Sequence, residues 1–319
     1  MSTRTRYPAD RGLTARMMTT VFLLGLLYAI FVTALFLAHV PLPLIIVIPL
    51  VVLACQYYFS DKIALWSMHA KLVTAEEAPQ LHGVVDRLCN LANMPKPKVA
   101  VANTDIPNAF ATGRNQKSAV VCVTTGILRR LDEPELEAVL SHELSHVAHR
   151  DVAVMTVASF LGIIAGFLTR MLYWSDLFGG LGGGMGGRGR GGNNNAGGGG
   201  QLVLFELGAL AFSALIYMIS FLLIRALSRY RELAADRAGA ILIGQPRLLA
   251  NALVKVSGEM SRIPTRDLRA AEHFNAFFFA PAFAKGASLS SLFSTHPSLE
   301  KRLEQLAKLE AQMGRGVSA

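Results

Sequence analysis

Four long apolar stretches set the organisation of this chain. Each is long enough for a helix of about 20 residues to cross the hydrocarbon core of a bilayer. They occupy residues 17–40, 41–59, 152–174 and 201–224, with Pro41 and Pro43 predicting a tight reversal between the first two. A cleaved signal peptide would have an apolar core of only about 7–15 residues and a small-residue cleavage site. The first stretch is therefore interpreted as a retained membrane anchor.

A soluble segment lies between the second and third stretches, at residues 60–150. An amphipathic helix is predicted over residues 79–94 from apolar positions at near-helical spacing: Leu81, Val84, Val85, Leu88 and Leu91. Short β-like runs follow at 98–102 and 119–124, and residues 108–112 between them are a candidate edge strand. A further helix begins near Asp132, with Glu135 in the capping-box position.

The rest of the chain adds a linker and two more helices. Residues 179–200 are mostly glycine and predict a flexible linker. Helices are expected over 231–243 and after Pro297. The resulting fold class is mainly α with a small β-sheet plus four transmembrane helices. The chain is expected to begin with a basic N-terminus (1–16) and a transmembrane hairpin (17–59), followed by the first catalytic part (60–151). A third span (152–174), a glycine-rich loop (175–200) and a fourth span (201–224) then lead to the second catalytic part (225–319).

Composition and charge support a membrane protein with a defined orientation. Residues are 52% hydrophobic and 17% charged, whereas about a quarter are charged in soluble domains. Cations gather at one end of every stretch: Arg4, Arg6, Arg11, Arg16, Lys62, Lys71, Arg150, Arg225, Arg229 and Arg231. The positive-inside rule places these cations and both termini in the cytoplasm. These positions give the net charge of +9 a use at the membrane. The sequence therefore predicts a multi-pass protein of the cytoplasmic (inner) membrane. It predicts no nucleic-acid partner, because no interleaving of aromatic and basic residues indicates one.

The sequence His142-Glu143-Leu144-Ser145-His146 carries the chemistry. On a helix, residues four apart share a face, so both imidazoles can bind one Zn²⁺. Glu143 can then take a proton from water at the metal. His149 is three residues past His146 and points off the shared face, which favours a solvated or interfacial role.

A catalytic zinc needs a third protein ligand, and Glu232 just past the fourth stretch is the best candidate. The simpler alternative is a solvated acid on a charged helix. Asp236 lies one helical turn further and can accept the N–H of a ligating histidine. Three cysteines, Cys55, Cys89 and Cys122, have no paired spacing and are assigned packing roles.

The motifs HELSHVAHRD, NAFATG, SRYRELAAD and STHPSLEKR, in this order around the apolar stretches, resemble the HtpX branch of the membrane-bound gluzincin metallopeptidases. The resemblance implies an α+β zincin-like catalytic domain with one Zn²⁺ on His142, His146 and Glu232, and Glu143 as catalytic base. It implies that Asn108, Ala109 and Phe110 bind the substrate backbone as an edge strand. It also implies that His296 and Arg302 stabilise the transition state or organise the site, although Pro297 alone would explain a helix-starting turn there.

The expected function is zinc-dependent hydrolysis of peptide bonds. The resemblance implies misfolded or damaged membrane proteins as substrates, so the expected partners are polypeptides and the lipid bilayer. Three alternatives remain open: a membrane scaffold with a structural zinc, a specific processing protease and a transporter. A structural zinc would need a fourth ligand, which no His or Cys is obviously placed to supply. The spans lack the paired broken helices and buried charges expected of a transporter.

Overall fold

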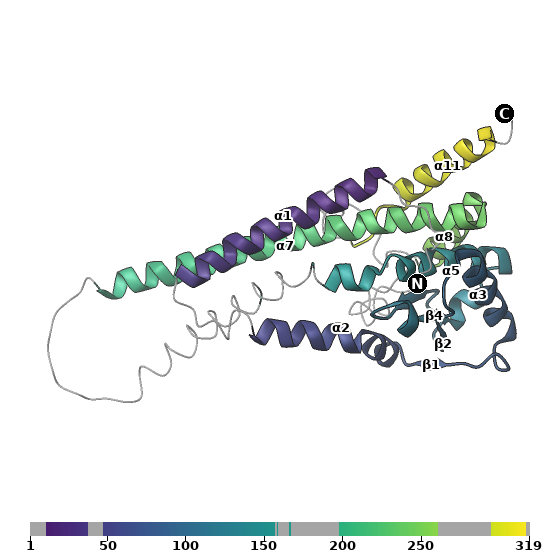
Figure 1. Cartoon of the computed structure of the whole chain (residues 1–319), viewed down its shortest axis with the longest axis horizontal. Coiled ribbons are helices and arrows are strands. Elements are labelled where there is room, and N and C mark those ends of the chain that lie inside the picture. The colour runs from purple at the N-terminus through teal and green to yellow at the C-terminus, as the bar shows by residue number, and fades with distance from the viewer. Residues whose placement is uncertain are drawn as a thin grey trace. The chain divides into compact units, whose positions relative to one another are not determined.

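The computed structural model describes residues 11–37, 47–156, 158, 166, 198–260 and 295–316. The chain divides into two compact units. Unit 1 comprises Met1–Thr20, Ala54–Thr156 and Arg225–Ala319, and unit 2 comprises Val21–Leu53 and Val157–Ile224. Figure 1 shows the elements along the chain.

Parts of two long helices make up most of the described part of unit 2. Helix α1 spans Arg11–Leu37, and α7 spans Gly198–Ile243 without a break. Phe31 is fully buried against Ile216, and its ring lies 6.0 Å from that of Phe212. Both helices are long and apolar enough to cross a membrane, over Thr14–Leu37 and Leu210–Ile243. The unbroken α7 also joins the predicted fourth span to the predicted helix at 231–243.

Two of the four predicted spans are thus seen as candidate spans among the described residues. The predicted second span at 41–59 lies partly outside the described residues. Its described part belongs to α2, Ile48–Ser67, which continues eight residues beyond Phe59 and is not among the candidate spans of the described residues. Most of the predicted third span and nearly all of the glycine-rich loop lie outside the described residues.

Unit 1 contains a four-stranded mixed sheet with the order β1-β2-β4-β3. Its strands are β1 (Ala70–Leu72), β2 (Lys98–Ala102), β3 (Ala109–Thr112) and β4 (Val120–Thr124). Strand β2 is parallel to β4, while β1 and β3 are antiparallel to their neighbours. All five residues of β4 are buried, as expected for an apolar β-branched run at the centre of a sheet. The predicted strands are confirmed, and β3 is an edge strand.

Most helices of unit 1 pack around one core. They are α3 (Pro79–Ala92), α4 (Thr125–Leu128), α5 (Glu133–Ala148), α8 (Pro246–Met260), α11 (Leu299–Gly316) and the end of α7. The end of α2 packs against the sheet in a separate buried cluster. The apolar side of α3 is buried as its spacing predicts, apart from Leu91, which is exposed. The capping box of α5 is present, with Asp132 and Glu135 each accepting the other's main-chain N–H. This cap fixes where the histidine helix begins.

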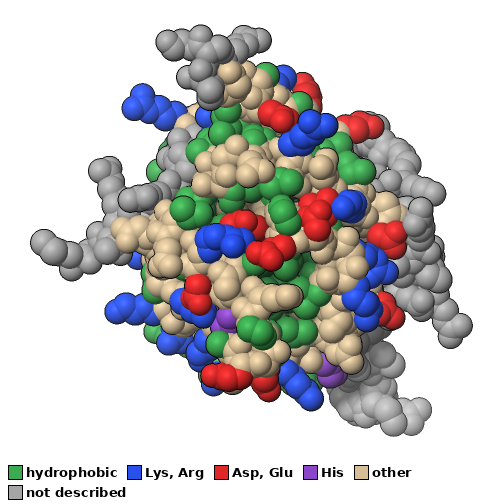
Figure 2. Space-filling model, turned by 90° about the vertical axis from the view of Figure 1, so that its right-hand side faces the viewer, with side chains coloured by type: hydrophobic (Ala, Val, Ile, Leu, Met, Phe, Trp, Pro, Cys, Tyr) green, Lys and Arg blue, Asp and Glu red, His purple; other side chains and the backbone are tan. Residues whose placement is uncertain are grey.

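The surface drawn in Figure 2 mixes acidic and basic side chains instead of gathering them by sign. Arg87 pairs with Glu133 and Glu137, and Lys96 pairs with Asp86.

Candidate metal centre

The two histidines of α5 face the same point. Their Nε2 atoms lie 3.2 Å apart, and His142 is buried while His146 is half-buried. Glu232 of α7 brings carboxylate oxygens to 3.7 Å from His142 Nε2 and 3.5 Å from His146 Nε2. Among the described residues, these three side chains are grouped with ligand atoms all within 4.8 Å of one another. The three ligands expected from the sequence therefore lie together.

A glycine allows the close approach of α7 to α5. A Cβ at Gly239 would lie 2.8 Å from the main-chain N of His142 and 3.0 Å from its Cα. The hydroxyl of Ser141 donates to the Gly239 carbonyl at 3.0 Å and fixes the contact. Glu232 lies two helical turns before this contact. The helices are thus close enough for one carboxylate to reach both imidazoles.

Each histidine is held by a carboxylate at its other ring nitrogen. His142 Nδ1 lies 2.9 Å from Asp236 Oδ1, and His146 Nδ1 lies 2.6 Å from Asp151 Oδ2. The pKa of the His142 imidazole is lowered, because the effect of burial exceeds that of the Asp236 carboxylate, which raises the pKa. A neutral imidazole that donates from Nδ1 presents its Nε2 lone pair, which is the form that binds a metal. Two such imidazoles and a carboxylate fit a divalent metal ion.

Arg302 lies behind Asp236. Both side chains are fully buried, and the guanidinium donates from Nε at 2.7 Å and from Nη2 at 2.6 Å. This bidentate pair fixes the carboxylate plane that His142 meets. Arg302 therefore contacts the site through Asp236, whose predicted position as a histidine partner is the one observed.

Glu143 lies between the histidines and the sheet. Its side chain is buried, and Oε2 accepts the N–H of Ala111 in β3 at 3.0 Å. Burial raises the pKa of the Glu143 carboxyl to about 8. A divalent cation at the neighbouring ligands would favour the ionised form. The carboxyl is thus suited to both accepting and returning a proton.

His296 approaches Glu232 from the segment before α11. Its Nδ1 lies 3.0 Å from Glu232 Oε2, and the neighbouring Thr295 carbonyl accepts the hydroxyl of Ser228 at 2.9 Å. The segment that carries His296 is therefore fixed to α7 beside the ligand. His149, in contrast, places Nδ1 2.8 Å from the Ser145 carbonyl oxygen of its own helix.

The predicted substrate strand coincides with β3 and the residue before it. The Asn108 carbonyl accepts the Thr124 N–H at 2.9 Å, so the main chain of Asn108 faces β4. Successive residues of an antiparallel strand alternate their main-chain groups between its two sides. Phe110 therefore also faces β4 through its main chain, whereas Ala109 and Ala111 face the outer edge, where Glu143 receives the Ala111 N–H.

Two residues of this centre had no predicted role in it: Asp151, the last residue of the motif HELSHVAHRD, and Arg231, which was interpreted only as a cation beside the fourth stretch. Arg231 of α7 forms an ion pair with Asp151, which holds His146. The available signal was an aspartate three residues after the end of the histidine helix. This aspartate can be predicted to contact His146 only once the helix is known to end at Ala148.

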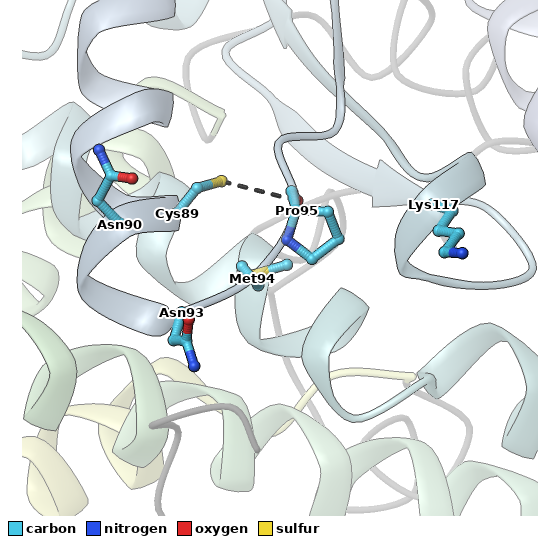
Figure 3. A pocket seen from close by; sticks show the side chains of 6 residues that line it. All are labelled: Cys89, Asn90, Asn93, Met94, Pro95 and Lys117. Carbon is cyan, nitrogen blue, oxygen red and sulfur yellow. Dashed lines mark hydrogen bonds between the residues drawn. The ribbon is translucent and has the colours of Figure 1, made fainter. Parts of the chain in front are cut away.

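A cavity of about 350 Å³ lies elsewhere in unit 1 (Figure 3). It is lined by the end of α3, the following turn and Lys117: Cys89, Asn90, Asn93, Met94, Pro95 and Lys117. The Cys89 Sγ lies 4.0 Å from the Pro95 carbonyl oxygen, and burial raises the pKa of this thiol to about 11. Such a thiol is inert at neutral pH. The cavity shares none of the residues of the metal centre.

Comparison with known proteins identifies the family. The model of peptidase family M48 matches residues 75–310. A protease HtpX homolog 1 from Streptomyces coelicolor is 55% identical over 98% of this chain and 97% of its own length. A protease HtpX homolog from Moorella thermoacetica is 53% identical over 97% of this chain and 98% of its own length.

The fold is also similar to the crystal structure of S. mikatae Ste24p, with a TM-score of 0.51 at 17% identity. The match covers 93% of this chain, which spans just under two thirds, 66%, of that solved chain. This similarity bears on the fold alone. The family match and the two close relatives, together with the His-His-Glu group, show that the chain belongs to peptidase family M48 as an HtpX-type metalloprotease.

Proposed function

We propose that this chain is a zinc endopeptidase of the cytoplasmic membrane that hydrolyses peptide bonds in misfolded or damaged membrane proteins on the cytoplasmic side. One observation carries the proposal. Glu143 lies on the same helix as His142 and His146, beside the point where both meet Glu232, and it also touches the edge strand β3. A base, a metal site and a strand that can pair with a peptide are therefore adjacent.

Zinc fits these donors, because two imidazoles and one carboxylate are a common ligand set for catalytic zinc and leave a position for water. His142, His146 and Glu232 would hold the ion. When bound, zinc supplies Lewis acidity, which lowers the pKa of water and polarises a carbonyl oxygen. The protein groups around it supply the proton transfers and the geometry.

Glu143 would act as general base and then as general acid. It takes a proton from the attacking water and passes it to the amine that leaves when the C–N bond breaks. The Glu143 carboxyl is held at Ala111, so the proton stays next to the strand on which the peptide would lie.

His296 and Arg302 would support this chemistry in different ways. His296 meets Glu232 through Nδ1, so a doubly protonated His296 ring would have its Nε2–H left to donate to the developing oxyanion. Arg302 is buried on Asp236 and would act by positioning His142 through that carboxylate.

The substrate would add to β3 as a further strand. Asn108, Ala109 and Phe110 bring the strand past the site, and the alternation of main-chain groups favours Ala109 and the carbonyl of Ala111 for bonds to the peptide. Recognition through the backbone gives weak sequence preference, which suits a protease that removes damaged proteins of many sequences. A specific processing protease would need side-chain pockets along this strand in addition.

The membrane topology proposed here has four crossings. Unit 1 collects three separate segments, and the proposal places their parts outside the spans on one side of the bilayer. If α1 and α7 each cross once, a second crossing must follow α1 and another must precede α7. The predicted spans at 41–59 and 152–174 would supply them. The cations beside these spans favour the cytoplasm for unit 1.

The test uses purified full-length protein with Glu143→Gln. The variant should keep the wild-type zinc content by elemental analysis and lose nearly all cleavage of an unfolded protein, because Glu143 is a base and not a ligand. The matched control is Glu137→Gln on the same helix, whose carboxylate pairs with Arg87 at the surface. The control should cleave normally. Cleavage by Glu143→Gln at the wild-type rate would rule out the proposed mechanism, and a zinc-loaded wild type without cleavage would favour a structural zinc.

A further inference from the structure

Asp151 stands where the histidine helix ends. Helix α5 stops at Ala148, and Arg150 adopts φ of 56°, in the left-handed region that arginine rarely enters. In an unbroken helix, a residue five positions after His146 would be rotated about 140° away from it. The turn at Arg150 instead brings Asp151 Oδ2 to 2.6 Å from His146 Nδ1. The break in the helix therefore places a carboxylate beside one of the two histidines of the metal centre.

Arg231 completes the arrangement from α7. Its guanidinium forms an ion pair with Asp151, and the two side chains are 8% and 13% exposed. Arg231 directly precedes Glu232. Two adjacent residues of α7 therefore make different contacts at the site. Glu232 lies near the Nε2 atoms of both histidines, and Arg231 pairs with the Asp151 carboxylate behind His146.

The same arrangement occurs twice at this centre. His142 is backed by Asp236, which is backed by Arg302, and both of these partners are fully buried. His146 is backed in the same order by Asp151 and Arg231. A carboxylate on Nδ1–H fixes the tautomer and ring orientation of a ligating histidine and raises its basicity. A bidentate or buried arginine holds that carboxylate in place.

We propose that Asp151 is a positioning residue for His146 and that Arg231 acts on the metal centre through Asp151. The inference rests on the proposed metal site. It predicts that the pair sets metal affinity, in addition to tying the end of α5 to α7. An ion pair that only joined the two helices would leave metal affinity unchanged once the protein is folded.

The experiment measures zinc affinity of metal-stripped, full-length protein by competition with a chromophoric chelator. Asp151→Ala should raise the zinc dissociation constant by about 10–100-fold. Asp151→Asn should have a smaller effect, since the amide oxygen still accepts the Nδ1–H but carries no charge. Because it keeps the shape of aspartate, this variant also serves if Asp151→Ala does not fold.

A double-mutant cycle separates the two roles of Arg231. Arg231→Gln alone should weaken zinc binding, by less than Asp151→Ala. In the Asp151→Ala background it should have almost no further effect, because its partner is gone. Fully additive losses would show that Arg231 acts independently of Asp151 and would overturn this part of the proposal.

The control is Glu135→Gln, which removes another buried carboxylate of α5 from an ion pair, with Lys255. It should not change the zinc dissociation constant. Replacing zinc by cobalt adds a spectroscopic readout: the visible absorption should shift in the Asp151 variants and not in the control. Wild-type affinity and an unshifted spectrum in both Asp151→Ala and Asp151→Asn, with binding lost in Glu232→Ala, would overturn the positioning role alone. Wild-type affinity in Glu232→Ala would overturn the proposed metal site itself.

Discussion

The contact at Gly239 gives a sharp test of how α7 and α5 form the metal centre together. In Gly239→Ala, the new Cβ would lie 2.8 Å from the main-chain N of His142, whereas ordinary contact begins at 3.4 Å. The opposing atoms belong to the backbone of α5 and cannot rotate away. Relief requires the helices to separate locally by about 0.6 Å, the difference between these two distances.

The expected effect on stability is small, because two terms oppose each other. Alanine in a helix interior is favoured over glycine by about 1 kcal/mol. Overpacking of a tight contact costs about 1–3 kcal/mol. The apo-protein should therefore lose between about 0 and 2 kcal/mol of unfolding free energy.

The expected effect on metal binding is larger. Metal–ligand distances tolerate only about ±0.2 Å, and Glu232 and Asp236 move with the segment of α7 that carries Gly239. A shift of this size disturbs a ligand and an outer carboxylate together. Zinc affinity should fall at least as far as when an outer partner is lost, by about 10–100-fold.

The assay compares zinc dissociation constants by chelator competition and apo-protein unfolding by circular dichroism. The control is Gly83→Ala in the middle of α3, where an added Cβ meets nothing within 4 Å. It should bind zinc normally and be slightly more stable. Unchanged zinc affinity in Gly239→Ala would refute the view that this close contact sets the ligand geometry.

Three further predictions follow from the same structure. Glu232→Ala should release zinc and abolish cleavage, measured by elemental analysis and proteolysis, whereas one zinc per chain at wild-type affinity would reopen the search for the third ligand. Arg302→Met should destabilise the fold by about 3–5 kcal/mol in denaturant unfolding, since it leaves the fully buried Asp236 charge without its partner; a loss below 1 kcal/mol would contradict a charged, paired Asp236. A tag inserted at Asn194 should be reachable only from outside the cell and a tag after Ala319 only from inside, and the reverse pattern would overturn the proposed orientation.

Much of the centre was predictable from the sequence because its signals are local. Two histidines four residues apart must share a helix face, whatever the rest of the fold. The cap formed by Asp132 and Glu135 is equally local, and it is observed as predicted. The prediction of Glu232 as a ligand needed one further inference, that the histidine helix and the end of the fourth stretch meet at the same membrane surface. The structure brings Glu232 to the histidines through the contact at Gly239, a glycine that carries no motif of its own.

Local rules of this kind predict neither where the second apolar helix ends nor which ion pairs support the ligands. Hydrophobic length placed the end of a span at Phe59, whereas the helix continues to Ser67. Asp151 reaches His146 only through the left-handed turn at Arg150, and it meets Arg231 only because α7 returns after more than 70 further residues. Helical periodicity would have placed Asp151 on the wrong face. Partners that orient a ligand are therefore the last part of such a site to be found from sequence, since they depend on where a helix ends and on what packs there.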